Sequence, residues 1–130
     1  MNENEKIDDP LTYKIIGCAM NVHKQLGNGF QEVIYQRALE IEFNKSKLAF
    51  SREQEIPVLY DEIMIGTRRV DFLVDDSVLV ELKALSKLED VHLAQGLNYL
   101  TAFKLDKGLL INFGGKSLEV KRLRHPKNKL

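Results

Sequence analysis

The stretch RVDFLVDDSVLVELKAL, residues 69–85, decides the fold of this chain. The polar cluster of Asp75, Asp76 and Ser77 predicts a short hairpin turn between two strands. Centring the turn on Asp76 places Asp71 directly opposite Glu81. Side chains alternate between the two faces of a strand, so one face of this hairpin is wholly apolar. Its members are Val70, Phe72, Val74, Val78, Val80 and Leu82.

The opposite face of the hairpin brings two carboxylates and an amine together. It carries Asp71, Leu73, Leu79, Glu81 and Lys83. A slip of one residue would mix the polar and apolar sets, so the register is strongly specified. Like charges opposite one another destabilise a sheet, and burying such a pair is costly unless something compensates.

A divalent cation would compensate for the two carboxylates. Hard carboxylate oxygens suit Mg²⁺ or Mn²⁺. The alternative is a solvent-facing sheet surface on which Lys83 bridges the two acids. The spacing alone leaves both interpretations open, and the metal site depends on support from the rest of the chain.

Length and composition indicate one globular domain. The chain has 130 residues, of which 44% are hydrophobic and 29% charged, and its formal net charge is zero. We expect a flexible segment at 1–10, a single domain at 11–123 and a basic tail at 124–130. The sequence KRLRHPKNKL, which ends the chain, could contact phosphate, or it could be a solvated terminus.

The single cysteine, Cys18, excludes an intramolecular disulfide framework and suits a reducing cytoplasm. It lies in an apolar helical run, which predicts a buried small side chain. The sequence shows no signal-peptide pattern and no long apolar run. We therefore expect a cytoplasmic protein that does not enter a membrane.

The periodicity predicts helices flanking a mixed β-sheet, in the order ααββββαββ. The expected helices are 11–26, 30–46 and 89–104, and the expected strands include 50–60, 63–65, 108–113 and 117–123, besides the two strands of the hairpin. A crossover helix after Lys83 predicts that the Gly108 strand runs parallel to the Glu81 strand. The fold class is α/β with α+β character.

The second predicted helix carries a further acid. Tyr35, Leu39 and Phe43 share one stripe, and Glu32 lies one turn before Tyr35 on the same side. Glu32 could complement the helix dipole or cap the helix. It could equally be a third acid aimed at the Asp71 and Glu81 site.

The third predicted helix carries a polar stripe beside its apolar one. His92, Gln95, Gly96 and Tyr99 follow helical spacing, so Gln95 and Tyr99 lie one turn apart. The ordinary interpretations are a capping or surface histidine, a surface glutamine and a core tyrosine. The functional interpretation places them at the site.

The order of these residues resembles the PD-(D/E)XK nuclease superfamily. Glu32 on a helix is followed by Asp71, by Glu81-Leu82-Lys83 and by Gln95-x-x-x-Tyr99, and this last pair resembles the RecB-like branch. More narrowly, Gly29, Glu32 and Tyr35 resemble the small GxxExxY protein family, as does His92-x-x-Gln95. The likeness runs from about Ile15 to Leu123, and it departs at Val70, where the superfamily has a proline.

The resemblance implies a restriction-endonuclease-like core and assigns roles. Asp71, Glu81 and the Leu82 carbonyl would ligate Mg²⁺ or Mn²⁺, with Glu32 assisting directly or through water. Lys83 would orient or activate the attacking water. Gln95 would act with these catalytic residues. The substrate-binding candidates are Tyr99, Tyr35 and His92.

Three functions follow from these assignments. The first is a metal-dependent nuclease that acts on DNA, because a bound metal supplies both charge neutralisation and a nucleophile. The second is a non-catalytic module that binds nucleic acid or a partner protein. The third is an enzyme for another phosphoester or nucleotide. We also expect a homodimer, for which the strand at 117–123 could offer an edge.

Overall fold

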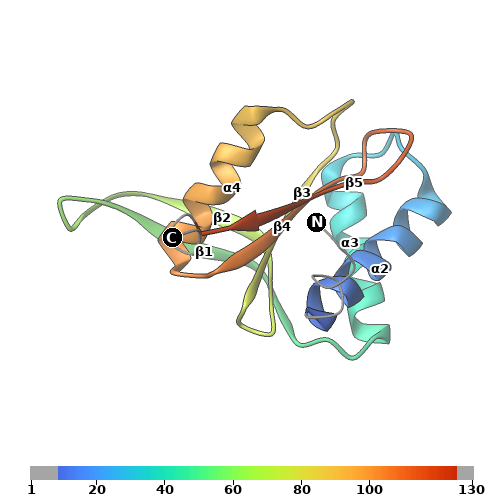
Figure 1. The fold of residues 1–130 in the computed structure, drawn as a ribbon, viewed down its shortest axis with the longest axis horizontal. Coiled ribbons are helices and arrows are strands. Elements are labelled where there is room, and N and C mark those ends of the chain that lie inside the picture. The colour runs from blue at the N-terminus through green and yellow to red at the C-terminus, as the bar shows by residue number, and fades with distance from the viewer. Residues whose placement is uncertain (1–8, 126–130) are drawn as a thin grey trace.

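The computed structural model describes residues 9–125, and it forms three helices and five strands there (Figure 1). In chain order these elements are α2 (Pro10–Leu26), α3 (Glu32–Lys45), β1 (Phe50–Tyr60), β2 (Ile63–Val74), β3 (Val78–Lys83), α4 (Asp90–Phe103), β4 (Lys107–Asn112) and β5 (Glu119–Arg124). The predicted class is confirmed, but the count of strands is one too high. Gly66 and Thr67 pair with β1 instead of breaking the chain, so residues 63–65 and the Asp71 strand are one strand.

The five strands form a single mixed sheet in the order β1-β2-β3-β4-β5. β3 and β4 are parallel, as the crossover helix predicts, and the other neighbours are antiparallel. The predicted hairpin register is confirmed where the ladder exists, because Phe72 pairs with Val80 and Val74 with Val78. Asp75 and Asp76 take positive φ angles of 54° and 52°, which closes the turn.

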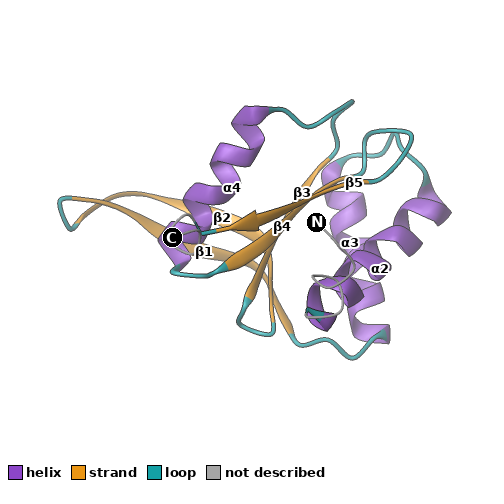
Figure 2. Cartoon of the chain, in the orientation of Figure 1, coloured by secondary structure: helices purple, strands orange, loops and turns teal. Residues whose placement is uncertain are grey.

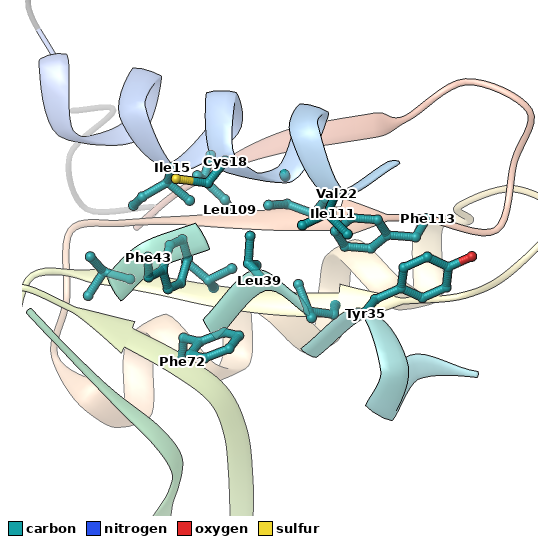
Figure 3. Close-up of a cluster of buried hydrophobic side chains, with 14 of the residues drawn as sticks. Ile15, Cys18, Val22, Tyr35, Leu39, Phe43, Phe72, Leu109, Ile111 and Phe113 are labelled. Carbon is teal, nitrogen blue, oxygen red and sulfur yellow. The ribbon is translucent and has the colours of Figure 1, made fainter. Parts of the chain in front are cut away.

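Helices cover both faces of the sheet (Figure 2). On one face, α2 and α3 bury aromatic rings against the sheet, with Phe43 and Phe72 edge to face at 5.0 Å between ring centres (Figure 3). Cys18 lies in this core as predicted. On the other face, α4 packs Leu100 against Leu79 and Leu110. The interior strand β4 is therefore buried on both faces, as its continuous apolar run predicts.

Val70 is the one residue of the hairpin's predicted apolar face that does not pack in the same core as the others. It clusters with Leu79 and Leu100 on the α4 side, whereas Phe72 packs with the α2 and α3 side. Strict alternation holds only along a regular strand. The ladders that hold β2 are interrupted at Asp71, between these two residues, so the alternation does not carry across it.

Asp9 and Pro10 belong to the expected flexible segment 1–10, but the structure places them at the start of α2. Asp9 is buried, its Oδ1 accepts the backbone N–H of Thr12 at 3.3 Å, and its Oδ2 accepts Lys107 Nζ at 2.9 Å. It thereby caps α2. The remainder of that segment and the basic tail after His125 lie outside the described residues. None of the helices between residues 9 and 125 is long and apolar enough to cross a membrane.

Two glycines make a matched test of the fold. A Cβ at Gly114 would meet the Leu85 backbone, whereas a Cβ at Gly17 would meet nothing within 4 Å. Gly17 lies in the exposed middle of α2, where alanine is favoured over glycine by about 0.5–1 kcal/mol. We expect Gly17→Ala to raise the free energy of unfolding by about this amount and Gly114→Ala to lower it by about 1–3 kcal/mol. Urea denaturation measures both, and equal effects would contradict the close approach at Gly114.

Candidate active site

The site is built where strand β2 loses both of its neighbours. The β1 ladder pairs Arg52 with Phe72 and Gln54 with Val70 but skips Glu53 and Asp71, and the β3 ladder ends at Phe72. Glu53 takes a positive φ of 56° at this point. Asp71 therefore has no partner residue in either of the two ladders.

Two carboxylates replace the missing ladder bonds. The Asp71 N–H donates to Glu81 Oε1 at 2.9 Å, and the Leu82 N–H donates to Asp71 Oδ2 at 2.8 Å. Each strand thus supplies an acid that accepts a backbone hydrogen of the other. The predicted convergence of Asp71 and Glu81 is present in the structure.

Burial makes this acid pair hold protons tightly. Only 7% of Glu81 is exposed. Burial, together with the charge of Asp71, raises the pKa of Glu81 to about 8. Burial also raises the pKa of Asp71, although the hydrogen bonds from Leu82 and Gln36 oppose the rise. Close to neutral pH the pair therefore does not carry two full negative charges without a cation.

Gln36 orients the acid pair, and the sequence reasoning missed it. Its Nε2 donates to Asp71 Oδ1 at 2.8 Å from a buried position on α3. It lies one turn after Glu32, next to Tyr35. A polar side chain beside the buried stripe of an amphipathic helix was the signal that could have found it, because buried amides need partners.

Asn112 fixes the chain directly after Lys83, and it was also missed. It pairs with Lys83 across β3 and β4 and is fully buried. Its Oδ1 accepts the Leu85 N–H at 2.8 Å, and its Nδ2 donates to the Leu85 carbonyl at 2.9 Å and to Glu119 Oε1 at 2.7 Å. These bonds fix the beginning of the segment that connects Lys83 to α4.

Glu32 begins α3 near the acid pair but does not join it. The residue is exposed, yet partial loss of water raises the pKa of its carboxyl, a rise that Lys83 opposes and Asp71 reinforces. Among residues 9–125, no three His, Cys, Asp or Glu side chains are grouped to hold a metal ion. The role of Glu32 as a ligand, directly or through water, stays a prediction, and in this structure Glu32 interacts with Lys83 and Asp71 through charge.

Tyr35 is a structural residue, which corrects its assignment to substrate binding. It is fully buried and stacks on Phe113 at 4.7 Å. Its hydroxyl donates to the Gly27 carbonyl at 2.6 Å and accepts the Phe30 N–H at 3.2 Å. With Gly29 at a φ of 109°, these bonds set where α3 starts and hence where Glu32 lies.

His92 caps α4, and its assignment to substrate binding stays a prediction. Its Nδ1 accepts the Glu89 N–H at 2.9 Å, and the Glu89 side chain accepts the backbone N–H of His92. This reciprocal capping box satisfies the free N–H groups of the first turn. His92 does not line the cleft described next.

A cleft of about 970 Å³ lies between the β1–β2 hairpin and α4. Lys83, Gln95 and Tyr99 all line it, together with Arg68. Burial and the charge of Glu81 raise the pKa of Tyr99, which indicates that the acid pair lies near this wall. Three of the predicted site residues thus share one cavity.

The donor set fits a hard divalent cation. Asp71 and Glu81 offer carboxylate oxygens side by side, and burial together with the charge of Asp71 raises the pKa of Glu81, which a bound cation would offset. Mg²⁺ is commonly held by one or two carboxylates with water completing its shell. Asp71, Glu81 and the Leu82 carbonyl are the groups that would hold it.

A family model described as the PD-(D/E)XK nuclease superfamily matches residues 9–123. This chain belongs to the PD-(D/E)XK nuclease superfamily. Asp71 and Glu81-Leu82-Lys83, which resemble the aspartate and the acid-x-lysine set in the name of the superfamily, lie within the matched residues. The five-stranded mixed sheet between helices is the restriction-endonuclease-like fold of that superfamily.

A solved structure supports the fold alone. The crystal structure of SSO0001 superposes on this chain with a TM-score of 0.58 and 19% sequence identity. The match covers 72% of this PD-(D/E)XK chain and 49% of SSO0001, so the present chain spans about half of that protein. None of the curated proteins matches this sequence.

The acid pair predicts how stability depends on pH. The pKa of Glu81 is about 8 in the folded protein against an ordinary 4.5, so the folded state keeps a proton that the unfolded state loses. In metal-free protein, the free energy of unfolding should fall as pH rises from 4.5 to 8, and this dependence should flatten in Glu81→Gln. Denaturation at several pH values measures it. Glu55→Gln, at an exposed acid, is the control, and an unchanged slope in Glu81→Gln would refute the assignment.

Proposed function

We propose that this protein is a metal-dependent nuclease that hydrolyses phosphodiester bonds, with DNA as its substrate. One observation carries the proposal: a buried Asp71–Glu81 pair with a strongly raised pKa lies beside a cleft that contains Lys83. A structural role alone gives little reason to keep two acids together in a buried place, because apolar residues of similar volume would fill it at lower cost. Membership of the superfamily supports the same chemistry.

A bound Mg²⁺ or Mn²⁺ would neutralise charge on the phosphate and lower the pKa of an attacking water. The acid pair would hold the cation, and the hydrogen bond from Gln36 Nε2 to Asp71 Oδ1 fixes the orientation of the Asp71 carboxylate. Lys83 lies at the end of β3, half-buried, where its ammonium group can orient the water and stabilise charge at phosphorus. Glu32 interacts with Lys83 and Asp71 through charge and in this proposal supports the site from the start of α3.

The cleft supplies the substrate contacts in this proposal. Gln95 and Tyr99 lie one turn apart on α4 and face the same cavity as Lys83. Arg68 and Lys104 add positive charge to its wall, which suits a phosphate backbone. The Gln95-x-x-x-Tyr99 pair supports placement in the RecB-like branch. The structural roles of Gly29 and Tyr35 in positioning Glu32 support the narrower GxxExxY assignment.

A non-catalytic nucleic-acid-binding module is the second candidate. Both oxygens of Asp71 already accept hydrogen bonds, from Gln36 and from the Leu82 N–H. A pair satisfied in this way can be stable without any cation. Binding that survives Asp71→Asn, without cleavage of any substrate, would favour this candidate.

Cleavage assays test the nuclease directly. We expect the purified protein to cut single- or double-stranded DNA with Mg²⁺ or Mn²⁺, and Lys83→Ala to reduce the rate by about 10²–10⁴-fold, because Lys83 acts on the attacking water. Lys87→Ala is the matched control, since Lys87 is an exposed lysine in the following loop. RNA and small phosphodiesters are assayed in parallel. Cleavage that Lys83→Ala leaves intact would indicate a contaminant and overturn the proposal.

Metal binding has a readout independent of cleavage. We expect Mg²⁺ or Mn²⁺ to raise the melting temperature, with a gain of about 2.7 kcal/mol when the ion is at about 100 times its Kd. Asp71→Asn should abolish the gain. Asp75→Asn is the control, because Asp75 is an exposed acid of the same hairpin with a positive φ that asparagine tolerates. A shift of equal size in both variants would show that the ion binds elsewhere.

A further inference from the structure

The tip of the β1–β2 hairpin exposes large apolar side chains on a ribbon that projects beyond the rest of the molecule (Figure 1). Every side chain of this group is between 59% and 70% exposed. We call the group the arm tip, and it consists of Leu59, Tyr60, Ile63, Met64 and Ile65. Such a concentration in one short hairpin is unlike the scattered exposed apolar residues of an ordinary surface.

The arm tip has no layer of its own fold to cover it. Residues 63–65 are three successive apolar residues, so both faces of the ribbon are apolar. A two-stranded hairpin without a packed face has marginal stability in water. Burial of these side chains against another surface would therefore stabilise the arm.

The turn of the arm is acidic. Asp61 and Glu62 connect the two strands at positive φ angles of 52° and 64°, and both are exposed. Two carboxylates at the leading end oppose insertion into a phosphate backbone or an anionic membrane. They favour a surface that combines apolar patches with positive charge.

The chain itself offers such a surface. The cleft beside α4 is lined by apolar side chains, among them Ile56, Val58 and Ala102, and by the cations Arg68, Lys83 and Lys104. None of the described residues that line it is acidic. Leu59 belongs to its wall, and from there the arm continues outward, so the turn of the same chain does not lie in it.

We propose that two copies of this chain form a homodimer by exchanging arms, with each acidic turn lying in the partner's cleft. The two contacts are equivalent, so the interface closes on itself. Apolar burial of the arm tips supplies stability, and the pairing of Asp61 and Glu62 with Arg68 and Lys104 supplies specificity. One alternative surface for dimer formation, the edge of β5, carries Lys121 and Arg124, charges that typically protect an edge from pairing.

Arm exchange would also affect access of substrate to the cleft, a consequence that rests on the proposed nuclease function. A partner's two carboxylates beside Lys83 and Arg68 would lie where a phosphate backbone is expected. The dimer and the bound substrate would then exclude one another. The dimer itself does not depend on this point, so its test uses no activity.

Charge reversal tests the proposed contact. Light scattering of the full chain should give twice the monomer mass of 14.9 kDa. The variant D61K/E62K and the variant R68E/K104E should each be monomeric, with dimer affinity at least about tenfold weaker. Mixing the two should restore the dimer mass, because each reversed arm then meets a reversed cleft. Circular dichroism verifies that both variants are folded.

Two results would overturn the proposal. A wild-type chain that is monomeric at high concentration has no arm exchange. A dimer that survives both charge reversals uses another surface, such as the β5 edge or apolar contact between the arm tips alone. Ile41→Ser is the control, since Ile41 is an equally exposed apolar residue on α3 and should leave the dimer unchanged.

Discussion

The structure depends on two crossed hydrogen bonds between carboxylates and backbone. Asp71 accepts the Leu82 N–H, and Glu81 accepts the Asp71 N–H, at the point where the β2 ladders stop. Backbone groups left unpaired in a buried place are costly, so the acids are the groups that allow the strands to separate there. Burial raises the pKa of both carboxyls, and the two backbone hydrogen bonds oppose that rise because they stabilise the charged forms.

Because the strands separate there, side chains from both faces of the sheet lie near the acid pair. Gln36 and Glu32 come from α3 on one face, and Gln95 and Tyr99 come from α4 on the other. A continuous sheet would keep these helices apart. Lys83 lies between the two groups, at the end of β3, and Asn112 holds the chain that leaves it.

Local sequence rules predicted what depends on local periodicity. The hairpin register, the parallel crossover and the acid pair all follow from alternation and turn chemistry, and the structure has them. The rules failed where a residue's role depends on a partner far along the chain. Tyr35 was expected to bind substrate because its motif gives no hint of the Gly27 carbonyl, and Gln36 was missed because its partner lies 35 residues away. Val70 was assigned to the wrong face because the alternation rule assumes a continuous ladder, and the ladder is interrupted at Asp71.

The interruption at Asp71 also divides the long β1–β2 ladder into two lengths. One length lies within the sheet, and the other forms a wall of the cleft. A ribbon bends most readily where its cross-strand bonds are absent, which here is Asp71 and its unpaired neighbour Glu53. The interruption thus lies at one of the two acids. A swing of the outer ribbon about this position would rotate the backbone that carries Asp71, so it would change the cleft and the spacing of the carboxylates together.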